Sequence, residues 1–171
     1  QVGVGVPGGA EASVHAARRF IVSMSPDTYF YKLDFKNAFN IVRRDEMLRL
    51  VRDEWPDLYA LVYMCYASSS LLDSGAYLLL SDEGFQQGDP LGPLLFCVSS
   101  LKLAHSMMSE FNSWYLDDGS LGGVVSSLLR DLEIIKRVGP SVSLLLNEDK
   151  CEIVTDDDSV VADIQSVLPR V

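Results

Sequence analysis

Two short hydrophobic segments with acidic residues near one end limit the folds open to this chain more than any other feature. Residues 29–35 are mainly aromatic and place Asp34 near their end, whereas residues 113–121 hold the acidic pair Asp117 and Asp118, followed by glycine, between segments that contain Trp, Tyr and Leu. Such segments are typical of strands, and Asp-Gly is a hairpin turn signal. Adjacent acids on a regular strand face opposite ways, but at a turn they can serve one site. If the two strands pair, all three acids converge.

Converging carboxylates imply a bound cation. Three carboxylates in a partly desolvated cleft repel one another by several kcal/mol unless cations are present. Oxygen ligands favour Mg²⁺, and two such ions about 4 Å apart can activate an attacking hydroxyl and stabilise a leaving oxygen in phosphoryl transfer. Structural interpretations stay open beside this one: the Asp117-Asp118 pair also suits a simple turn, and Asp34 also suits a strand-end cap or a salt bridge.

The rest of the sequence predicts an α+β domain in which helices alternate with antiparallel strands. Hydrophobic spacing of three or four residues and turn signals place the helices. The predicted helices are 11–24, 37–55 in two parts, 57–66, 89–108 with Asp89 as cap and Pro90 at the first position, 126–138, and a last helix to 167. Further strands are predicted at 76–81, 143–146 and 151–154.

Composition sets the class of protein and raises one objection. The 171 residues are 48% hydrophobic and 22% charged, which is normal for a globular domain with its own core. The net charge of −10 counts against a domain that grips phosphates by itself. A site for cations needs local carboxylates, however, and missing parts of a larger protein can carry the basic surface. The chain opens at Gln1 inside a glycine-rich stretch, as expected for a piece of something longer.

The cysteines and apolar runs point to an intracellular protein. Cys65, Cys97 and Cys151 are widely spaced and form no metal or disulfide pattern, so we expect free thiols in a reducing compartment. The longest apolar runs are too short to span a membrane, and no signal peptide is visible. We therefore expect no membrane partner.

Four segments, in order, resemble the reverse transcriptases of non-LTR (LINE-like) retrotransposons, and the glycine-rich start, 3–10, resembles the helix entry in the family's fingers. The segments are 33–40 (Leu-Asp-Phe-Lys-Asn-Ala-Phe-Asn), 86–93 (Gln-Gln-Gly-Asp-Pro-Leu-Gly-Pro), 115–118 (Tyr-Leu-Asp-Asp) and 146–152 (Leu-Asn-Glu-Asp-Lys-Cys-Glu). The resemblance implies a polymerase palm with part of the fingers. Residues 1–28 would be partial fingers and 29–171 mainly palm, with the thumb and the upstream fingers absent.

The resemblance also implies metal and catalytic roles. Asp34 and Asp117 would hold two Mg²⁺ ions, which Mn²⁺ can replace. Asp118 would complete the site, and the Phe35 carbonyl would be a further ligand. Lys150 would donate a proton to the leaving pyrophosphate, although a solvated surface lysine fits its sequence context equally well.

The resemblance implies a nucleotide pocket built from two of these segments. The backbone of Lys36, Asn37 and Ala38 would face the incoming triphosphate, and Gln87 and Gly88 would line the nucleotide and template pocket. Phe39, five residues after Asp34, would clash with a ribose 2′-hydroxyl and so favour deoxynucleotides. Its alternative is a core residue at helical spacing.

The implied function is RNA-directed DNA polymerase activity, with an RNA template, a DNA primer and dNTPs as partners and the nucleus as the compartment of a retrotransposon enzyme. Without thumb and upstream fingers, we expect weak or no synthesis by the piece alone. The alternative is a non-catalytic remnant or interaction module with a palm-like fold. We expect Trp114 to pack against the sheet. Six arginines can touch phosphates, but solvated helix faces explain them more simply: Arg18, Arg19, Arg43, Arg44, Arg49 and Arg52.

Overall fold

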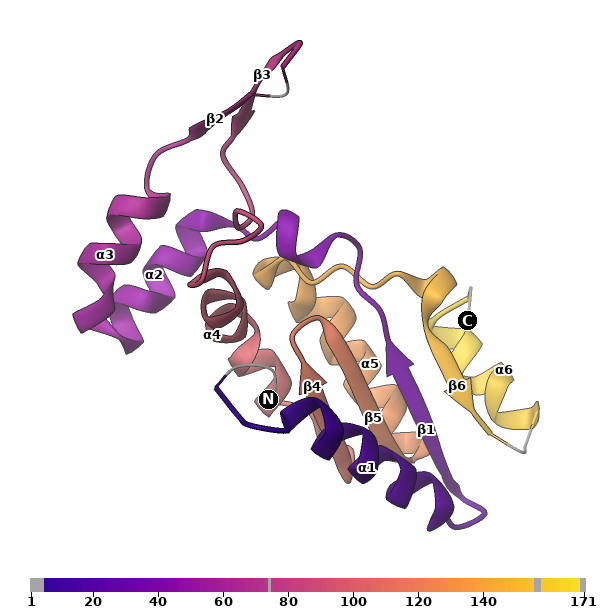
Figure 1. Ribbon diagram of the computed structural model, residues 1–171. Coiled ribbons are helices and arrows are strands. Elements are labelled where there is room, and N and C mark those ends of the chain that lie inside the picture. The colour runs from indigo at the N-terminus through magenta and orange to yellow at the C-terminus, as the bar shows by residue number, and fades with distance from the viewer. Residues whose placement is uncertain (1–4, 74, 156–157, 170–171) are drawn as a thin grey trace.

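A four-stranded antiparallel sheet with the strand order β4-β5-β1-β6 forms the centre of the molecule (Figure 1). The computed structural model describes residues 5–73, 75–155 and 158–169. The strands are β1 (Thr28–Leu33), β4 (Phe111–Tyr115), β5 (Asp118–Val124) and β6 (Glu152–Val154). β1 is central because it pairs with β5 over its full length and with β6 over part of it.

One face of this sheet packs on helices and forms the core. These helices are α4 (Gly92–His105) and α5 (Val125–Val138); in Figure 1 α5 lies behind the strands and α4 to the left of β4. The sheet contributes Tyr31, Leu33 and Leu121, which are fully buried. On α5, three residues at helical spacing are fully buried and give the helix one apolar face: Leu128, Leu132 and Ile135.

The opposite face is covered only in part, by α1 (Gly9–Val22). Phe20 of α1 packs between Phe30 and Phe111, with ring centroids 6.3 and 5.2 Å away. A Cβ atom on Gly122 would lie 2.4 Å from the Phe20 ring, so glycine is needed for this approach. α1 also reaches β4 close to the acidic hairpin, where Ser13 Oγ and Ser113 Oγ are 2.6 Å apart.

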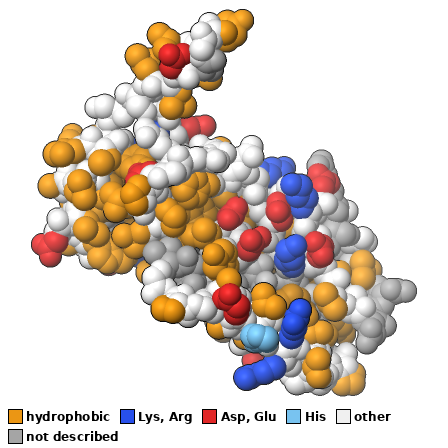
Figure 2. Space-filling view, in the orientation of Figure 1, with side chains coloured by type: hydrophobic (Ala, Val, Ile, Leu, Met, Phe, Trp, Pro, Cys, Tyr) orange, Lys and Arg blue, Asp and Glu red, His pale blue; other side chains and the backbone are white. Residues whose placement is uncertain are grey.

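A second region projects from the sheet and holds two helices and a hairpin (Figure 1). After the short 3₁₀ turn η1 (Ala38–Asn40) come α2 (Arg44–Glu54), α3 (Pro56–Tyr66), β2 (Ser70–Asp73) and β3 (Leu78–Ser81). β2 and β3 form a separate two-stranded sheet whose leucines are largely exposed. Figure 2 shows hydrophobic side chains gathered over this region, whereas acidic and basic side chains are interspersed over the region of α1 and β1.

The chain finishes with the 3₁₀ turns η2 (Gly139–Val142) and η3 (Glu148–Lys150), then β6 and α6 (Asp158–Val167), which packs against α5. Within the described residues, no helix is long and apolar enough to cross a membrane. The α+β class, the antiparallel sheet and its flanking helices are as the sequence predicts.

Several element boundaries differ from the sequence prediction. The helix predicted at 89–108 spans Gly92–His105, because the Asp89 carboxylate accepts the Leu91 N–H and holds a turn before the helix begins. The predicted strand 143–146 is not formed: these residues follow η2 without regular structure, apart from a single bridge between Phe35 and Leu146. β2 was not predicted, and its counterpart β3 is shorter than the expected 76–81.

The acidic hairpin turns earlier than its Asp-Gly signal predicts. Tyr115 pairs with Asp118, so the two turn residues are Leu116 and Asp117, and Leu116 adopts a left-handed φ of 54°. Asp118 and Gly119 belong to β5. Gly119 thus serves packing and not the turn, since a Cβ there would lie 2.9 Å from Leu33 Cδ1.

Candidate active site

Strand register brings Asp34 to the tip of the acidic hairpin. Leu33 of β1 pairs with Gly119 of β5, so the residue after Leu33 and the residue before Gly119 are neighbours at the same end of the sheet. Lys32 pairs with Ser120, and residues two apart on a strand share a face. Asp34 and Asp118 therefore lie on one face, the face that α1 partly covers, and Asp118 lines a pocket together with α1. Asp117 is at the turn beside them.

The electrostatics of Asp118 record this proximity. Partial burial and the carboxylate of Asp117 raise the pKa of Asp118 above its ordinary range, and the carboxylate of Asp34 adds to this effect. The Lys32 ammonium opposes the rise in the pKa of Asp118, but Lys32 is also paired with Glu152 at 3.2 Å. Mutual repulsion among carboxylates is what a bound cation would relieve.

The three acids are neighbours without forming a closed metal-binding group. Among residues 5–73, 75–155 and 158–169, no three His, Cys, Asp or Glu side chains are gathered closely enough to hold an ion. Asp117 and Asp118 are exposed and Asp34 is half-buried. The donor set is nevertheless oxygen only, which suits Mg²⁺, an ion that takes few protein ligands and completes its shell with water and phosphate oxygens.

The segment after α5 fixes the backbone of Asp34. The Asn147 N–H donates to the Asp34 carbonyl at 2.9 Å, and the Asp34 N–H donates to Cys151 Sγ at 3.5 Å. Next to them, the Lys36 N–H donates to the Leu145 carbonyl at 2.8 Å. These contacts account for the short bridge at Phe35 and were not visible in the sequence. Lys150 is exposed in η3, within the turn that Asn147 begins.

Aromatic packing supports the hairpin from below. The Phe35 ring stacks on Trp114 at a centroid distance of 5.8 Å, and Trp114 Nε1–H donates to Asn112 Oδ1 at 2.7 Å. Trp114 is buried, which confirms the prediction that it packs against the sheet. Phe35 and Trp114 therefore form a tightly packed base under the hairpin that carries the acids.

The predicted nucleotide-binding residues fall into two neighbouring segments. Lys36 and Asn37 are exposed, Asn37 has a left-handed φ of 45°, and Ala38 is buried. Phe39 packs against Phe85 and Phe96, at centroid distances of 5.2 and 6.0 Å. These contacts are those of a core residue, although the ring of Phe39 is only partly buried.

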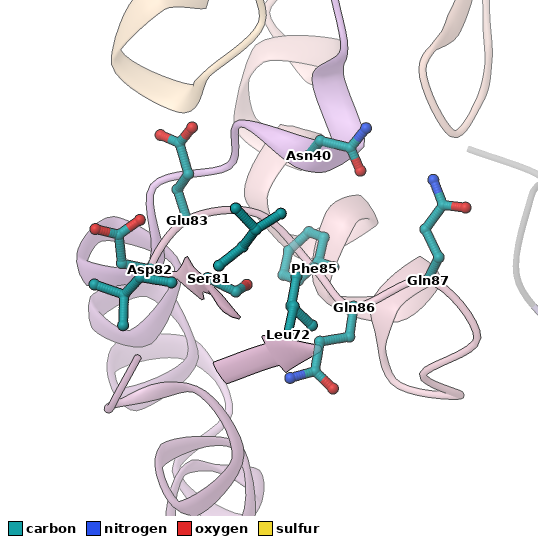
Figure 3. Close-up of a pocket in the computed structure, with 10 residues that line it drawn as sticks. Asn40, Leu72, Ser81, Asp82, Glu83, Phe85, Gln86 and Gln87 are labelled. Carbon is teal, nitrogen blue, oxygen red and sulfur yellow. The ribbon is translucent and has the colours of Figure 1, made fainter. Parts of the chain in front are cut away.

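Gln87 and Gly88 lie across from this segment on the loop before α4. Both are exposed, and Gly88 has a φ of 90° with open space where a Cβ would be. The Phe85 N–H donates to the Phe39 carbonyl at 3.1 Å and so ties the two segments together. A cavity of about 620 Å³ adjoins them. In Figure 3 the amide groups of Asn40 and Gln87 lie on one side of this cavity, away from the carboxylates of Asp82 and Glu83.

Two buried charged residues were not expected. Arg44, which we expected on a solvated helix face, is buried and donates to the carbonyls of Ser81, Glu83 and Gly84. Its position among the charged residues Arg43, Asp45 and Glu46 gave no signal of this. Asp131 of α5 is also fully buried. Its carboxylate accepts the backbone N–H groups that follow α4, those of Met108 and Ser109.

The comparisons with known proteins agree with this architecture. The model of the family described as reverse transcriptase (RNA-dependent DNA polymerase) matches residues 6–162. No curated protein matches the sequence. The solved structure of telomerase from Candida albicans in complex with a TWJ fragment of telomeric RNA has a TM-score of 0.59 and 14% identity, with 86% of this chain and 30% of that chain covered.

Apo telomerase from Candida tropicalis is similar, with a TM-score of 0.59 and 10% identity over 86% of this chain and 32% of that chain. The same telomerase truncated from its C-terminal domain also has a TM-score of 0.59, with 11% identity over 88% of this chain and 35% of that chain. Identities this low show a shared fold alone. The chain spans only about a third of the length of these solved chains.

Proposed function

Because the chain belongs to the reverse transcriptase family, we propose that it carries the catalytic centre of an RNA-directed DNA polymerase. The reaction would join a dNTP to a primer 3′-hydroxyl, with an RNA strand as template. The register that places Asp34 beside the acidic hairpin, at one end of the sheet, carries this proposal.

Asp34, Asp117 and Asp118 would be the metal ligands, and the Phe35 carbonyl a further one. Two Mg²⁺ or Mn²⁺ ions would supply a more acidic attacking hydroxyl and a stabilised leaving oxygen. The raised pKa of Asp118 supports this assignment, because like charges kept together without a cation cost stability. The packed base under the hairpin would hold the acids in place, and the Asn147 contact would orient the Asp34 backbone.

The nucleotide would lie between the η1 segment and the loop before α4. The backbone of Lys36, Asn37 and Ala38 would face the triphosphate, and the backbone at Gly88 can approach a base closely because its Cβ position is open. Phe39 would select deoxynucleotides with the exposed part of its ring, while Gln87 would contact nucleotide or template. Lys150 would protonate the leaving pyrophosphate.

We further propose that the parent is a non-LTR retrotransposon enzyme that acts in the nucleus. Residues 1–28 would belong to the fingers and 29–171 mainly to the palm. The four motif segments and their order support this subtype. Thumb and further fingers segments would then supply the basic surface that a chain of net charge −10 lacks.

The test is Mg²⁺-dependent DNA synthesis on an RNA template with a DNA primer. The proteins are this chain and the longer parent, each as wild type, Asp117→Asn and the control Asp27→Asn. Asp27 is an exposed acid in the loop before β1. Loss of a transition-state ligand should lower the parent's rate by about 10²-fold or more, while Asp27→Asn should be neutral. Normal synthesis by folded Asp117→Asn would refute the metal role, and a parent without synthesis would favour a non-catalytic remnant.

A further inference from the structure

Arg44 is a buried cation whose donors all go to one short segment. Its Nε–H donates to the Gly84 carbonyl at 2.9 Å, and Nη1–H donates to the Ser81 carbonyl at 2.8 Å. Nη2–H donates to Ser81 Oγ and to the Glu83 carbonyl, at 2.9 and 3.1 Å. In the described chain Arg44 belongs to no ion pair, so these oxygens must compensate its buried charge. A lysine lacks the fork geometry to reach all of them.

Tyr66 extends this network to the other end of the loop. The Arg44 guanidinium lies over the Tyr66 ring, 5.4 Å from its centroid. The Tyr66 hydroxyl donates to Asp89 Oδ2, while Asp89 Oδ1 accepts the Leu91 N–H at 2.8 Å. The Asp89 N–H donates to the Gln86 carbonyl at 3.1 Å and closes the turn. Both ends of the segment 84–89 are thus held from α2 and α3.

The middle of this segment has little to hold it in place. Gln87 and Gly88 are exposed, and Gly88 has open space around its Cβ position. Gln86 makes one side-chain contact, from its Nε2–H to Ser70 Oγ at 3.0 Å. The position of Gln87 and Gly88 relative to Phe39 therefore depends on the anchored ends, together with the bond from the Phe85 N–H to the Phe39 carbonyl.

We propose that Arg44 and Tyr66 are positioning residues that hold the Gln87-Gly88 turn at the nucleotide pocket. They act through the loop and touch neither the nucleotide nor the metal ligands. The expected effect on nucleotide affinity rests on the proposed function. The position of the turn is a property of the chain that can be measured separately.

The test compares Tyr66→Phe and Arg44→Lys with wild type and with the control Arg43→Lys. Arg43 is the exposed neighbour of Arg44 and is paired with Asp45 at 2.6 Å. The first measurement is amide hydrogen exchange, followed separately in peptides over 84–91 and in peptides over the strands β1 and β5. The second is the affinity for Mg²⁺-dGTP by calorimetric titration. Tyr66→Phe should speed amide exchange over 84–91 by roughly tenfold and leave the exchange of strands β1 and β5 unchanged. It should weaken dGTP binding by a similar factor.

The outcomes separate the inference from the proposed function. Unchanged exchange over 84–91 in Tyr66→Phe, or equal acceleration over the whole sheet, overturns the positioning role. So does unchanged dGTP affinity where the wild type binds. If the wild type binds no dGTP, the proposed nucleotide site fails, and the exchange data alone decide the positioning role. Tyr66→Phe keeps the inference testable if Arg44→Lys does not fold.

Discussion

The pKa of Asp118 is raised by its position in the site. Burial, the Asp117 carboxylate and the Asp34 carboxylate raise its pKa, so the folded chain keeps a proton on Asp118 at pH values where the unfolded chain has released it. Stability contributed by this group is therefore present below its ordinary pKa near 4 and falls as pH rises through the raised pKa. Ionised Asp118 destabilises the fold at neutral pH.

We predict that Asp118→Asn raises the melting temperature at pH 7 and has no such effect near pH 3. The gain should be on the order of 1 °C, because an exposed carboxylate in water is screened. Thermal denaturation at both pH values measures it. Mg²⁺ should stabilise the wild type more than the variant. Equal melting temperatures at pH 7, with or without Mg²⁺, would contradict the repulsion inferred at the hairpin.

A second residue-scale prediction concerns Gly84, which has a φ of 68° and backbone close by. A Cβ there would lie 2.1 Å from the Asn40 carbonyl oxygen, so Gly84→Ala must move backbone. We expect a loss of about 3 kcal/mol or more in the free energy of unfolding. The control is Gly75→Ala, where φ is 79° but nothing lies within 4 Å. Urea denaturation should show a loss of only about 1 kcal/mol for the control; equal losses would contradict the close approach.

At the scale of elements, a buried carboxylate joins α5 to the loop between α4 and β4. Asp131 of α5 accepts the N–H groups of Met108 and Ser109, at 2.7 and 2.8 Å, and the Ser109 hydroxyl at 2.5 Å. It thereby fixes the chain between α4 and β4, the first strand of the acidic hairpin. A buried carboxylate satisfied by several donors is worth more than its exposed counterpart.

We predict that Asp131→Asn lowers the free energy of unfolding by about 2 to 3 kcal/mol, because an amide N–H₂ would face donors where an oxygen is needed. Asp163→Asn, at an exposed position of α6, is the control and should change it by about 0.5 kcal/mol or less. Chemical denaturation with tryptophan fluorescence measures both. An Asp131→Asn variant as stable as wild type would show that these contacts contribute little.

Elements with strong local signals could be predicted from the sequence. α5 was predicted to within a residue because its apolar residues recur at helical spacing, and β1 because its aromatic run is bounded by turns. The start of α4 was predicted three residues early, since the Asp89 carboxylate holds a turn rather than the first helical N–H groups. β2 could not be predicted from the sequence, because only its pairing with β3 identifies it as a strand.

For the whole molecule, charge is the property that most limits nucleic-acid binding. The net charge is −10, and many basic side chains already face acids, among them Lys32, Arg43, Arg49, Arg52 and Lys102. The acidic excess opposes the approach of phosphates to the exposed cations that remain. This agrees with the expectation that other parts of a longer protein grip the duplex.

We therefore predict weak, weakly salt-dependent binding of an RNA–DNA primer-template by this chain. The slope of log K against log[salt] should be about −2 or shallower. Fluorescence anisotropy of a labelled duplex at several KCl concentrations gives the slope, with a duplex-binding basic peptide as reference. A slope near −6 would show that the described surface makes many phosphate contacts after all.

The candidate site was predictable in outline because its acids lie at strand ends, where register alone brings them together. The neighbouring positions of Asp34 and the acidic hairpin were predicted in this way, whereas their role as metal ligands stays a prediction. The supports were not predictable: Cys151, Asn147 and Arg44 act through long-range contacts that leave no periodic pattern in the sequence. Whether the acids share ions is a matter of side-chain placement, which spacing does not encode.

The most direct test of that central claim is Mn²⁺-induced broadening of amide NMR signals in this chain, with Mg²⁺ as competitor. The account predicts that residues 33–36 and 116–119 lose intensity together at low Mn²⁺, that Mg²⁺ restores both, and that Asp34→Asn weakens the effect at both segments. Broadening of one segment alone, or of both segments regardless of Asp34→Asn, would contradict a shared cation site.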